Sequence, residues 1–583
     1  MKQESKLGKV IWILICIAMI SFTLLGYLKG IFISSDIDES YALAQSYRLA
    51  TGDKMFVHMW ESHQLSAFLG AIFIKLYISV LNTTEYLVIY LRIIGIFLHT
   101  AIGIWIYSVL KKDFSRKISF LVLMLHLNFL PKWVQMPEFE LMHYWSVLMI
   151  FLLLYGHLRQ EKKGFLRPFM AGVCVVFSMM SYPTMVLLYP FLAVGLFILE
   201  KKKLKSILYL TLGALISGGG FLAYLLSYQS VKELIENVSY IFLDESHSME
   251  ETAFKWQYYK IEIVEQIESY FVHMAIALIL VVLIVVIRAF ILRRNKRSLE
   301  FAIISVLILT AVFMGINQVF GCVFGDENQF YLLLRYVAVL IPGIYLGIRY
   351  HKKYGIIFWF CIVPGIVSFV AALLITNMTL NVCYAKMFVG VIGSILILYQ
   401  YIKEMLPKEH IKSGTVLIFA LIFSILCGFF VCRILLIRVT GCLPVTIKAP
   451  LCQMEEGPLK GVYVLNTDGI IWNENNAILK ECIKEGDRLL YIGPDNMIYP
   501  ATECVVASPS TQGTTVYNEM FIYYYEKHSD KIPNVIVIDK TFESNPIYHY
   551  SENNRILLDW IKANFESITI EETNYLKILR VQE

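Results

Sequence analysis

Three carboxylates gather at one place in the N-terminal part of the chain: Asp36, Asp38 and Glu39. They stand at the start of a stretch whose apolar and long side chains recur at helical spacing up to Gly52, a residue typical of a helix C-terminus. The pattern predicts an amphipathic helix headed by acids. A carboxylate in such a position could take a proton from a reacting hydroxyl or amine.

A purely structural role explains the same acids. Ser35 and Asp38 have the S-x-x-D spacing of a capping box, and acids near a helix N-terminus complement the helix dipole. The residues alone therefore leave two interpretations open, a reactive carboxylate and a helix cap.

Further polar residues follow in the same part of the chain. His58, Glu61 and His63 could in principle ligate a metal, but their spacing matches no strong metal signature, so a divalent metal is not indicated. In a second segment, Pro131 to Glu140, the acids Glu138 and Glu140 precede His143. These side chains could form a second wall of a site, or cap a helix and face solvent.

Two arginines occur within apolar stretches of the chain. Arg92 and Arg335 each lie about one turn inside the end of such a stretch. An arginine at bilayer depth costs roughly 3 kcal/mol on insertion scales, so it usually has a partner or a function. Bidentate binding of a phosphate is one such function, and snorkelling of the side chain to the membrane interface is the alternative.

The composition indicates which solvent these residues meet. The 583-residue chain is 57% hydrophobic and 17% charged, whereas soluble domains carry roughly 25% charged residues. The bilayer is the plausible solvent for such a chain. A net charge of +5 with basic residues confined to short loops does not suggest a nucleic-acid partner.

The basic residues also predict the topology. Short clusters of Lys and Arg alternate with loops that are nearly free of them, such as 181–184 and 376–379. By the positive-inside rule we expect the clusters and the N-terminus to be cytoplasmic. The membrane is expected to be the plasma membrane, and the first span is expected to be a retained signal anchor. The clusters lie at residues 2–9, 111–117, 159–167, 201–205, 288–297, 349–353 and 403–412.

Counting apolar stretches predicts about thirteen spans of roughly 20 residues each, which places the C-terminus outside. Gln64 to Leu81 is apolar enough to span, but a span there would invert every later cluster. We therefore expect it to lie in or dip into the outer leaflet. Two large outer loops result, at residues 31–85 and 227–270.

The last part of the chain has a different pattern of apolar and polar residues. Short apolar runs at 461–466, 488–493, 503–507 and 534–539 alternate with helical patterns at 474–484 and 517–528. This alternation predicts a small extracytoplasmic α/β domain over 441–583 with a largely parallel sheet, after a transmembrane domain over 1–440. No phosphate-binding loop occurs in it. Its four cysteines could pair if they lie outside: Cys442, Cys452, Cys482 and Cys504.

Several of these motifs, in this order, resemble the integral-membrane GT-C glycosyltransferases, above all the protein mannosyltransferase (family 39) and aminoarabinose transferase type. The resemblance covers the N-terminal two thirds of the chain, by order and topology more than by identity. It departs from the family at His63-Gln64-Leu65, where prolines are expected, and at Glu138, where Asp is commoner. The motifs are Asp38-Glu39-Ser-Tyr41, Arg48-Leu-Ala-Thr-Gly52, Trp60-Glu-Ser-His63, Arg92, Pro137-Glu138 and Arg335-Tyr336.

The resemblance implies transfer of a sugar from a polyprenyl-phosphate donor to a glycan, lipid or protein acceptor on the outer face. A phosphate leaving group needs no protonation, so one carboxylate suffices as general base. Asp38 is the best candidate, with Glu39 and Asp36 as competitors, and Arg92 and Arg335 are expected to hold the phosphate. The residues expected to contact substrate are His63, Glu138, Trp60 and Tyr41.

Two other classes of protein remain as alternatives. A transporter or flippase of a lipid-linked cell-envelope precursor would be expected to show repeats and acids at mid-span, which the sequence does not display. A membrane-anchored scaffold would leave the acid-headed helix unexplained. The sequence leaves the sugar, the acceptor and the oligomeric state open.

Overall fold

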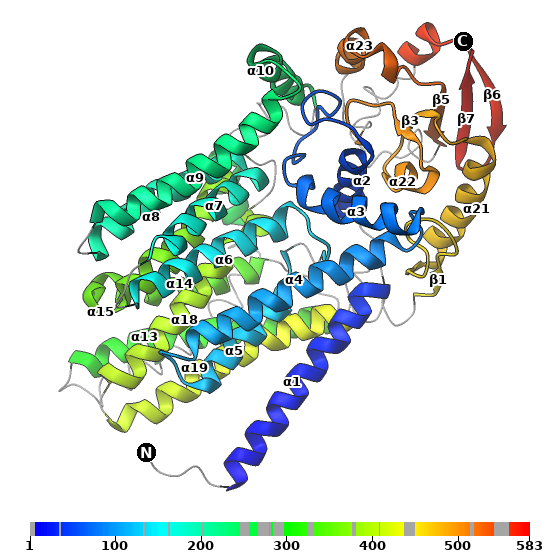
Figure 1. Cartoon of the computed structure of the whole chain (residues 1–583). Coiled ribbons are helices and arrows are strands. Elements are labelled where there is room, and N and C mark those ends of the chain that lie inside the picture. The colour runs from blue at the N-terminus through cyan, green and yellow to red at the C-terminus, as the bar shows by residue number, and fades with distance from the viewer. Residues whose placement is uncertain are drawn as a thin grey trace.

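The computed structural model shows a helical bundle with a smaller α/β domain at one end (Figure 1). It describes residues 6–33, 37–131, 134–160, 164–200, 203–244, 256–265, 279, 282–283, 296–324, 330–375, 380–406, 408–435, 449–512, 518–540 and 559–582. The loop boundary predicted near residue 441 and the acid Asp36 fall outside these ranges.

The bundle consists of long apolar helices. Among the described residues, eight helices are long and apolar enough to cross a membrane. The predicted multi-span helical architecture is therefore confirmed, while the count of thirteen stays a prediction. The eight are Lys6–Phe32, Leu87–Leu110, Phe139–Leu158, Leu204–Leu226, Glu300–Phe320, His351–Leu373, Tyr384–Met405 and His410–Ile434.

The second of these eight is α4 (Leu87–Leu110), and further helices complete the bundle. They include α5 (Arg116–Asn128), α7 (Leu166–Ser181), α8 (Leu188–Leu199) and α14 (Phe330–Arg349). Helices α6 (Phe139–Leu158), α7 and α9 (Lys203–Leu226) pack side by side. The start of α1 (Lys6–Phe32) and the short α15 (His351–Ile357) lie at the end away from the α/β domain (Figure 1). We call the end of the bundle that carries the α/β domain its outer end, and the membrane face that each end meets stays a prediction.

Helix α3 (Ala67–Leu81) is the ambiguous apolar segment of the sequence. It has 15 residues, fewer than the ~20 that a span requires. It packs against α2 (Ile37–Thr51) at the end of the bundle that carries the α/β domain (Figure 1). The structure thus agrees with the expectation that this segment does not cross the membrane.

The C-terminal domain is built on a five-stranded sheet of order β4-β3-β5-β7-β6. β3 (Arg488–Ile492) pairs in parallel with β4 (Val505–Val506) and β5 (Val535–Asp539). β7 (Leu576–Val581) is antiparallel to both β5 and β6 (Ser567–Glu572). The expectation of a largely parallel sheet was wrong, because a C-terminal hairpin extends it. Outward-facing β6 is mostly exposed, so it lacks the continuous apolar run that revealed the buried strands.

The remaining C-terminal elements flank this sheet. The run predicted as a strand at 461–466 forms β2 (Tyr463–Leu465), which pairs with β1 (Leu451–Gln453) in a separate two-stranded sheet. Helices α21 (Asn466–Cys482), α22 (Ile498–Thr502) and α23 (Asn518–Lys527) connect the strands. Cys452, Cys482 and Cys504 are free cysteines, and Cys442 lies outside the described residues.

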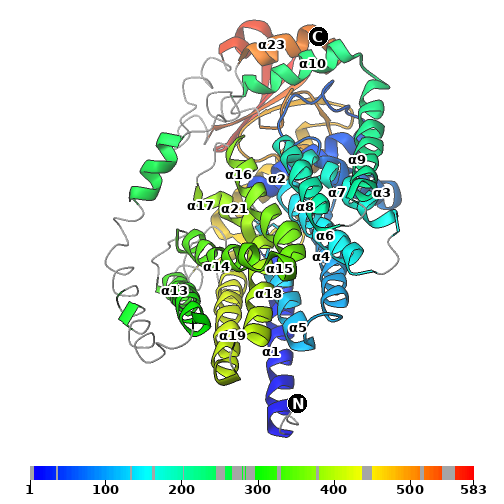
Figure 2. The same cartoon turned by 90° about the vertical axis from the view of Figure 1, so that its left-hand side faces the viewer.

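The two large outer loops meet the C-terminal domain. Helix α10 (Val231–Tyr240), from the second of them, lies beside α23 at the top of the molecule (Figure 2). Lys527 of α23 forms an ion pair of 2.8 Å with Glu236 of α10. From the first outer loop, the fully buried Trp60 enters the hydrophobic core of the C-terminal domain. The outer loops and the domain therefore form one continuous outer layer above the bundle.

Candidate active site

Helix α2 places the three acids of the first outer loop differently. It begins at Ile37, directly after α1, so its first turn lies where the outer loop leaves the bundle. Asp38 is partly buried and Glu39 is buried. The predicted capping partner Ser35 lies outside the described residues, as Asp36 does, so the structure leaves the capping interpretation untested.

Glu39 is joined to Arg92 by a buried ion pair. Nη2 of Arg92 lies 2.5 Å from Oε2 of Glu39, and Nε lies 2.8 Å from Oε1. The remaining Nη1 donates to the carbonyl of Ile31 at 2.9 Å. This two-point geometry is among the strongest that arginine makes. Each charge therefore compensates the other, which disfavours Glu39 as a base and Arg92 as a phosphate ligand, although both assignments stay predictions.

Tyr182, at the N-cap of η2 (Pro183–Leu187) after α7, is buried among several ionisable groups. Burial raises the pKa of Tyr182 well above its ordinary value, and Cys383, Glu138 and Asp38 add to the effect. The phenol therefore stays protonated and can act as a hydrogen-bond donor. Asp38 thus shares its surroundings with the start of α6 and the 181–184 loop, two segments that the sequence placed on the outer side.

Glu138 and Glu140, which the sequence left as either a wall of the site or a helix cap, have different contacts in the structure. Glu138 is the N-cap of α6, because its carboxylate accepts from the backbone N–H groups of Leu141 at 2.6 Å and Glu140 at 2.7 Å. Glu140 instead ion-pairs with Lys386. The hydroxyl of Tyr182 donates to Oε1 of Glu140 at 2.5 Å and accepts from Lys386 Nζ at 3.2 Å. Glu138 as a substrate ligand stays a prediction.

Sequence reasoning missed Lys386. It lies in η6 (Tyr384–Met387), at the outer start of α18 (Phe388–Met405), and is buried. A signal was present, because this lysine follows the 376–379 loop, in a region that is otherwise free of basic residues. A lone lysine on the outer side is a candidate for a buried charge with a specific partner.

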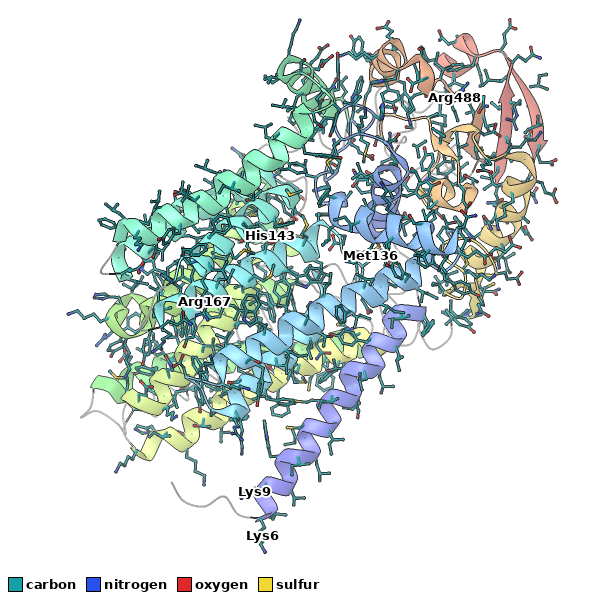
Figure 3. The ribbon with its side chains drawn as sticks, in the orientation of Figure 1. Lys6, Lys9, Met136, His143, Arg167 and Arg488 are labelled. Atoms are coloured by element: carbon teal, nitrogen blue, oxygen red, sulfur yellow. The ribbon has the colours of Figure 1, made fainter. Side chains whose placement is uncertain are left out.

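A cavity adjoins the Glu140–Lys386 pair, between α6 and α18. Apart from that pair its walls are largely apolar, with His143 as a further polar residue. His143 Nδ1 lies 2.8 Å from Ser178 Oγ, which fixes the ring. Figure 3 shows His143 in the interior, between the far end marked by Lys6 and the α/β domain marked by Arg488. The lining residues are Pro131, Glu140, His143, Tyr144, Val147, Ala385, Lys386 and Val389.

Arg335 is buried in the outer half of the bundle. Its Nη1 donates to Oε1 of Gln318 at 2.9 Å and its Nη2 to Oγ of Ser424 at 3.2 Å. Its Nε and the hydroxyl of the neighbouring Tyr336 have no hydrogen-bond partner. Among the residues that the structure describes, no carboxylate pairs with this guanidinium. The geometry is compatible with an anionic ligand, although the assignment to the donor phosphate is untested.

The other side chains predicted to contact substrate mostly make contacts within the outer layer of the protein. Trp60 stacks on Tyr240 with ring centroids 4.3 Å apart and contacts Tyr524 edge-on. His63, at φ 60°, stacks on Phe139 with centroids 4.0 Å apart. The third of them, Tyr41, donates from its hydroxyl to a loop carbonyl, that of Ser62. Contact of these three residues with substrate stays a prediction. Of the three, His63 packs edge-on against Tyr182.

A second feature missed in the sequence is the charge network around Arg48. Its guanidinium is fully buried and lies 2.8 Å from Asp53 and 3.1 Å from Glu61. Glu61 also accepts from the backbone N–H and the hydroxyl of Thr511 in the C-terminal domain, at 2.9 and 2.7 Å. Burial alone would raise the pKa of Asp53, but Arg48 and Lys531 hold it below its ordinary value. This network fastens α2 to the C-terminal domain.

His58, Glu61 and His63, which were considered as metal ligands, have different partners in the structure. Glu61 belongs to the Arg48 network, His63 stacks on an aromatic ring, and His58 lies 3.7 Å from Asp53. In the part of the chain that the structure describes, no group of three His, Cys, Asp or Glu side chains is placed to hold a metal ion.

Comparison with known proteins finds similarity at the level of structure. The chain is similar to ArnT from Cupriavidus metallidurans bound to undecaprenyl phosphate, with 9% identity, a TM-score of 0.48, and coverage of 99% of this chain and 98% of that chain. It is also similar to an Archaeoglobus fulgidus oligosaccharyltransferase tethered with an acceptor peptide, with 10% identity, a TM-score of 0.46, and coverage of 97% and 74%.

Both neighbours are GT-C membrane glycosyltransferases. No protein-family model and no curated protein matches the chain.

Proposed function

We propose that the protein transfers a sugar from a polyprenyl-phosphate donor to an acceptor on the outer face of the membrane. One observation carries the proposal: Asp38, in the first turn of α2 at the outer end of the bundle, is partly buried and contributes to the raised pKa of Tyr182. This carboxylate therefore stands at the end of the bundle where we expect a lipid-linked donor and an external acceptor to meet.

The reaction is a single displacement. Asp38 accepts a proton from the acceptor hydroxyl or amine, whose lone pair attacks the anomeric carbon of the sugar. The bond from that carbon to the phosphate oxygen breaks, and the polyprenyl phosphate departs with the electron pair. The sugar is thereby transferred with inversion, and Asp38 carries the proton away.

The departing phosphate requires a cation on the side of the sugar opposite the acceptor. Arg335 fits this task, because its buried guanidinium is paired with neutral groups only, Gln318 and Ser424. A phosphate would supply the missing charge, and charge-assisted hydrogen bonds are about twice as strong as neutral ones. The ammonium of Lys386 is already compensated by Glu140, which assigns it to holding the cavity wall.

The placement of the charges favours an enzyme over a transporter. Glu140 and Lys386 lie in the first turn of α6 and just before α18, at the outer ends of their spans. A proton-coupled transporter would be expected to bury such groups near mid-span. Transfer of sugar, rather than movement of an intact lipid precursor, is therefore the better-supported activity.

The decisive experiment measures sugar transfer by Asp38→Asn in the purified protein. A general base contributes roughly 100–10,000-fold in rate, so transfer should nearly vanish while donor binding persists. The matched control is Glu233→Gln, since Glu233 occupies the N3 position of an exposed capping box in α10. Both variants lose a cap-like acid. Equal and small effects in the two would contradict the proposal and favour the capping interpretation.

A further inference from the structure

A further buried arginine, Arg433, lies near the end of the span His410–Ile434, away from the residues assigned above. Arg433 lies in the π-helical segment η7 (Val431–Leu435) that follows α19 (Lys408–Phe430), and its side chain is 6% exposed. Single π-helical turns in otherwise α-helical spans occur frequently at functional sites. The sequence analysis did not single out this residue.

The contacts of Arg433 are all with neutral groups. Its Nη1 donates to the carbonyl of Leu127 at 3.1 Å and to Oδ1 of Asn128 at 3.3 Å. Its guanidinium lies 4.6 Å from the centre of the Tyr27 ring. Asn128 is itself fixed, because its amide donates to the hydroxyl of Thr23 at 2.8 Å. The pocket therefore orients the guanidinium rigidly without compensating its charge.

One nitrogen of this guanidinium makes no hydrogen bond. Nη2 of Arg433 is buried and has no hydrogen-bond partner, and no carboxylate among the described residues pairs with the side chain. A buried charge without an opposite charge is strongly unfavourable, so such a group ordinarily has a partner that completes it.

The surroundings indicate what the partner is. The buried residues of α1 are Met19, Thr23, Gly26 and Tyr27, which form one stripe in the outer half of that helix. The rest of α1 carries exposed apolar side chains along its length, and α1 lies at the edge of the bundle (Figure 1). Arg433 thus lies beside the outer half of α1, a helix whose other side chains are apolar and exposed.

We infer that Arg433 binds the phosphate of a membrane lipid between α1, the end of α5 and η7. An anionic phosphate oxygen supplies both the missing charge and the acceptor for Nη2. Arginine suits this task, because its planar fork matches phosphate oxygens. The site is separate from Arg335, which contacts α13 (Lys296–Phe324) and α19, and it requires no assumption about sugar transfer.

Gly26 offers a way to test the site without removing the arginine. A Cβ added at Gly26 would lie 3.5 Å from Cζ and Nε of Arg433, an ordinary contact distance. Gly26→Asp therefore places a carboxylate beside the guanidinium and supplies the missing charge from within the protein. Gly26→Ala adds the same carbon without charge and is the matched control.

The experiment measures lipid retained by the full-length protein. Wild type and variants are reconstituted in phosphatidylcholine nanodiscs alone, with added phosphatidylglycerol, or with added polyprenyl phosphate, then re-extracted in detergent and weighed by native mass spectrometry. We expect Arg433→Gln and Gly26→Asp to retain at least ~10-fold less phosphate lipid, as loss of a hydrogen bond to a charged group predicts. Gly26→Ala should retain it.

The two lipid arms identify the source of the phosphate. Retention of phosphatidylglycerol alone identifies a phospholipid headgroup, and retention of polyprenyl phosphate alone identifies the carrier lipid; either outcome supports the site. Should Arg433→Gln and Gly26→Asp keep both lipids at the wild-type level, Arg433 is not a lipid-phosphate ligand. A failure of Arg433→Gln to fold leaves Gly26→Asp, judged against Gly26→Ala, to decide.

Discussion

Lys531 of the C-terminal domain reaches into the first outer loop, where its Nζ lies 2.5 Å from Oδ1 of Asp53. The other carboxylate oxygen of Asp53 is held by Nε of Arg48 at 2.8 Å. Asp53 is thus bonded from both sides, once within its own loop and once across to the domain. Through Arg48, which belongs to α2, this contact couples the helix that carries Asp38 to residues more than 400 positions further along the chain.

The first prediction concerns this coupling. Lys531→Met should lower the stability of the full chain by about 1.5–3 kcal/mol, because a buried charge-assisted hydrogen bond is lost. Transfer should fall as well, since α2 loses its support from the domain. The control is Lys540→Met, which removes an exposed pair with Glu572. Thermal unfolding and transfer assays measure the effect, and equal behaviour of the two variants would refute the coupling.

The second prediction concerns pH. Burial lowers the pKa of His58 to about 4, with Asp53 opposing the effect, so the folded protein resists a proton that the unfolded chain accepts near 6.5. Unfolding is therefore favoured as the pH falls from about 6.5 to about 4, and the stabilising contribution is fully present above that window. His58→Gln should flatten this dependence.

The measurement is the unfolding temperature of wild type minus that of His58→Gln across this pH range. The difference is needed because burial raises the pKa of Glu61, which contributes with the opposite sign above its ordinary pKa of 4.5. Asp53 acts in the same direction as His58, but below its ordinary pKa of 3.8. A difference that does not change with pH would show that His58 titrates normally in the folded protein.

The third prediction separates the two roles considered for Arg92. Glu39→Gln should destabilise the fold by about 3–5 kcal/mol, because a buried guanidinium loses its counter-charge. The double variant Glu39→Gln/Arg92→Met should recover much of that loss. If Arg92 only supports Glu39, the double variant binds the donor lipid as wild type does. Loss of donor binding in a stable double variant would instead establish Arg92 as a phosphate ligand.

The fourth prediction tests the orientation of the chain. Cysteines introduced at Lys112, exposed in the turn after α4, and at Glu474, exposed on α21, should react with membrane-impermeant reagents from opposite sides of the membrane. The positive-inside distribution requires Lys112 to be cytoplasmic. Labelling of both positions from one side would overturn the topology and, with it, the external placement of Asp38.

The sequence by itself determined the features that depend on neighbours along the chain. Apolar stretches of spanning length, the basic loops and the helical spacing from Ile37 to Gly52 are local patterns, and the structure shows helices at those places. The short apolar runs also located β3, β4 and β5. The exposed strand β6 was missed, since its residues need no continuous apolar run.

Only the tertiary structure decided which charges meet. Glu39 and Arg92 are 53 residues apart, Glu140 and Lys386 are 246 apart, and Asp53 and Lys531 are 478 apart. A buried charge must find its partner among whatever the packing of other helices brings near, and nothing in its local sequence encodes that neighbour. The same acid-headed helix could have presented Glu39 to a substrate. In the folded chain Arg92 of α4 meets Glu39 instead, and this ion pair is what the tertiary structure adds to the local pattern.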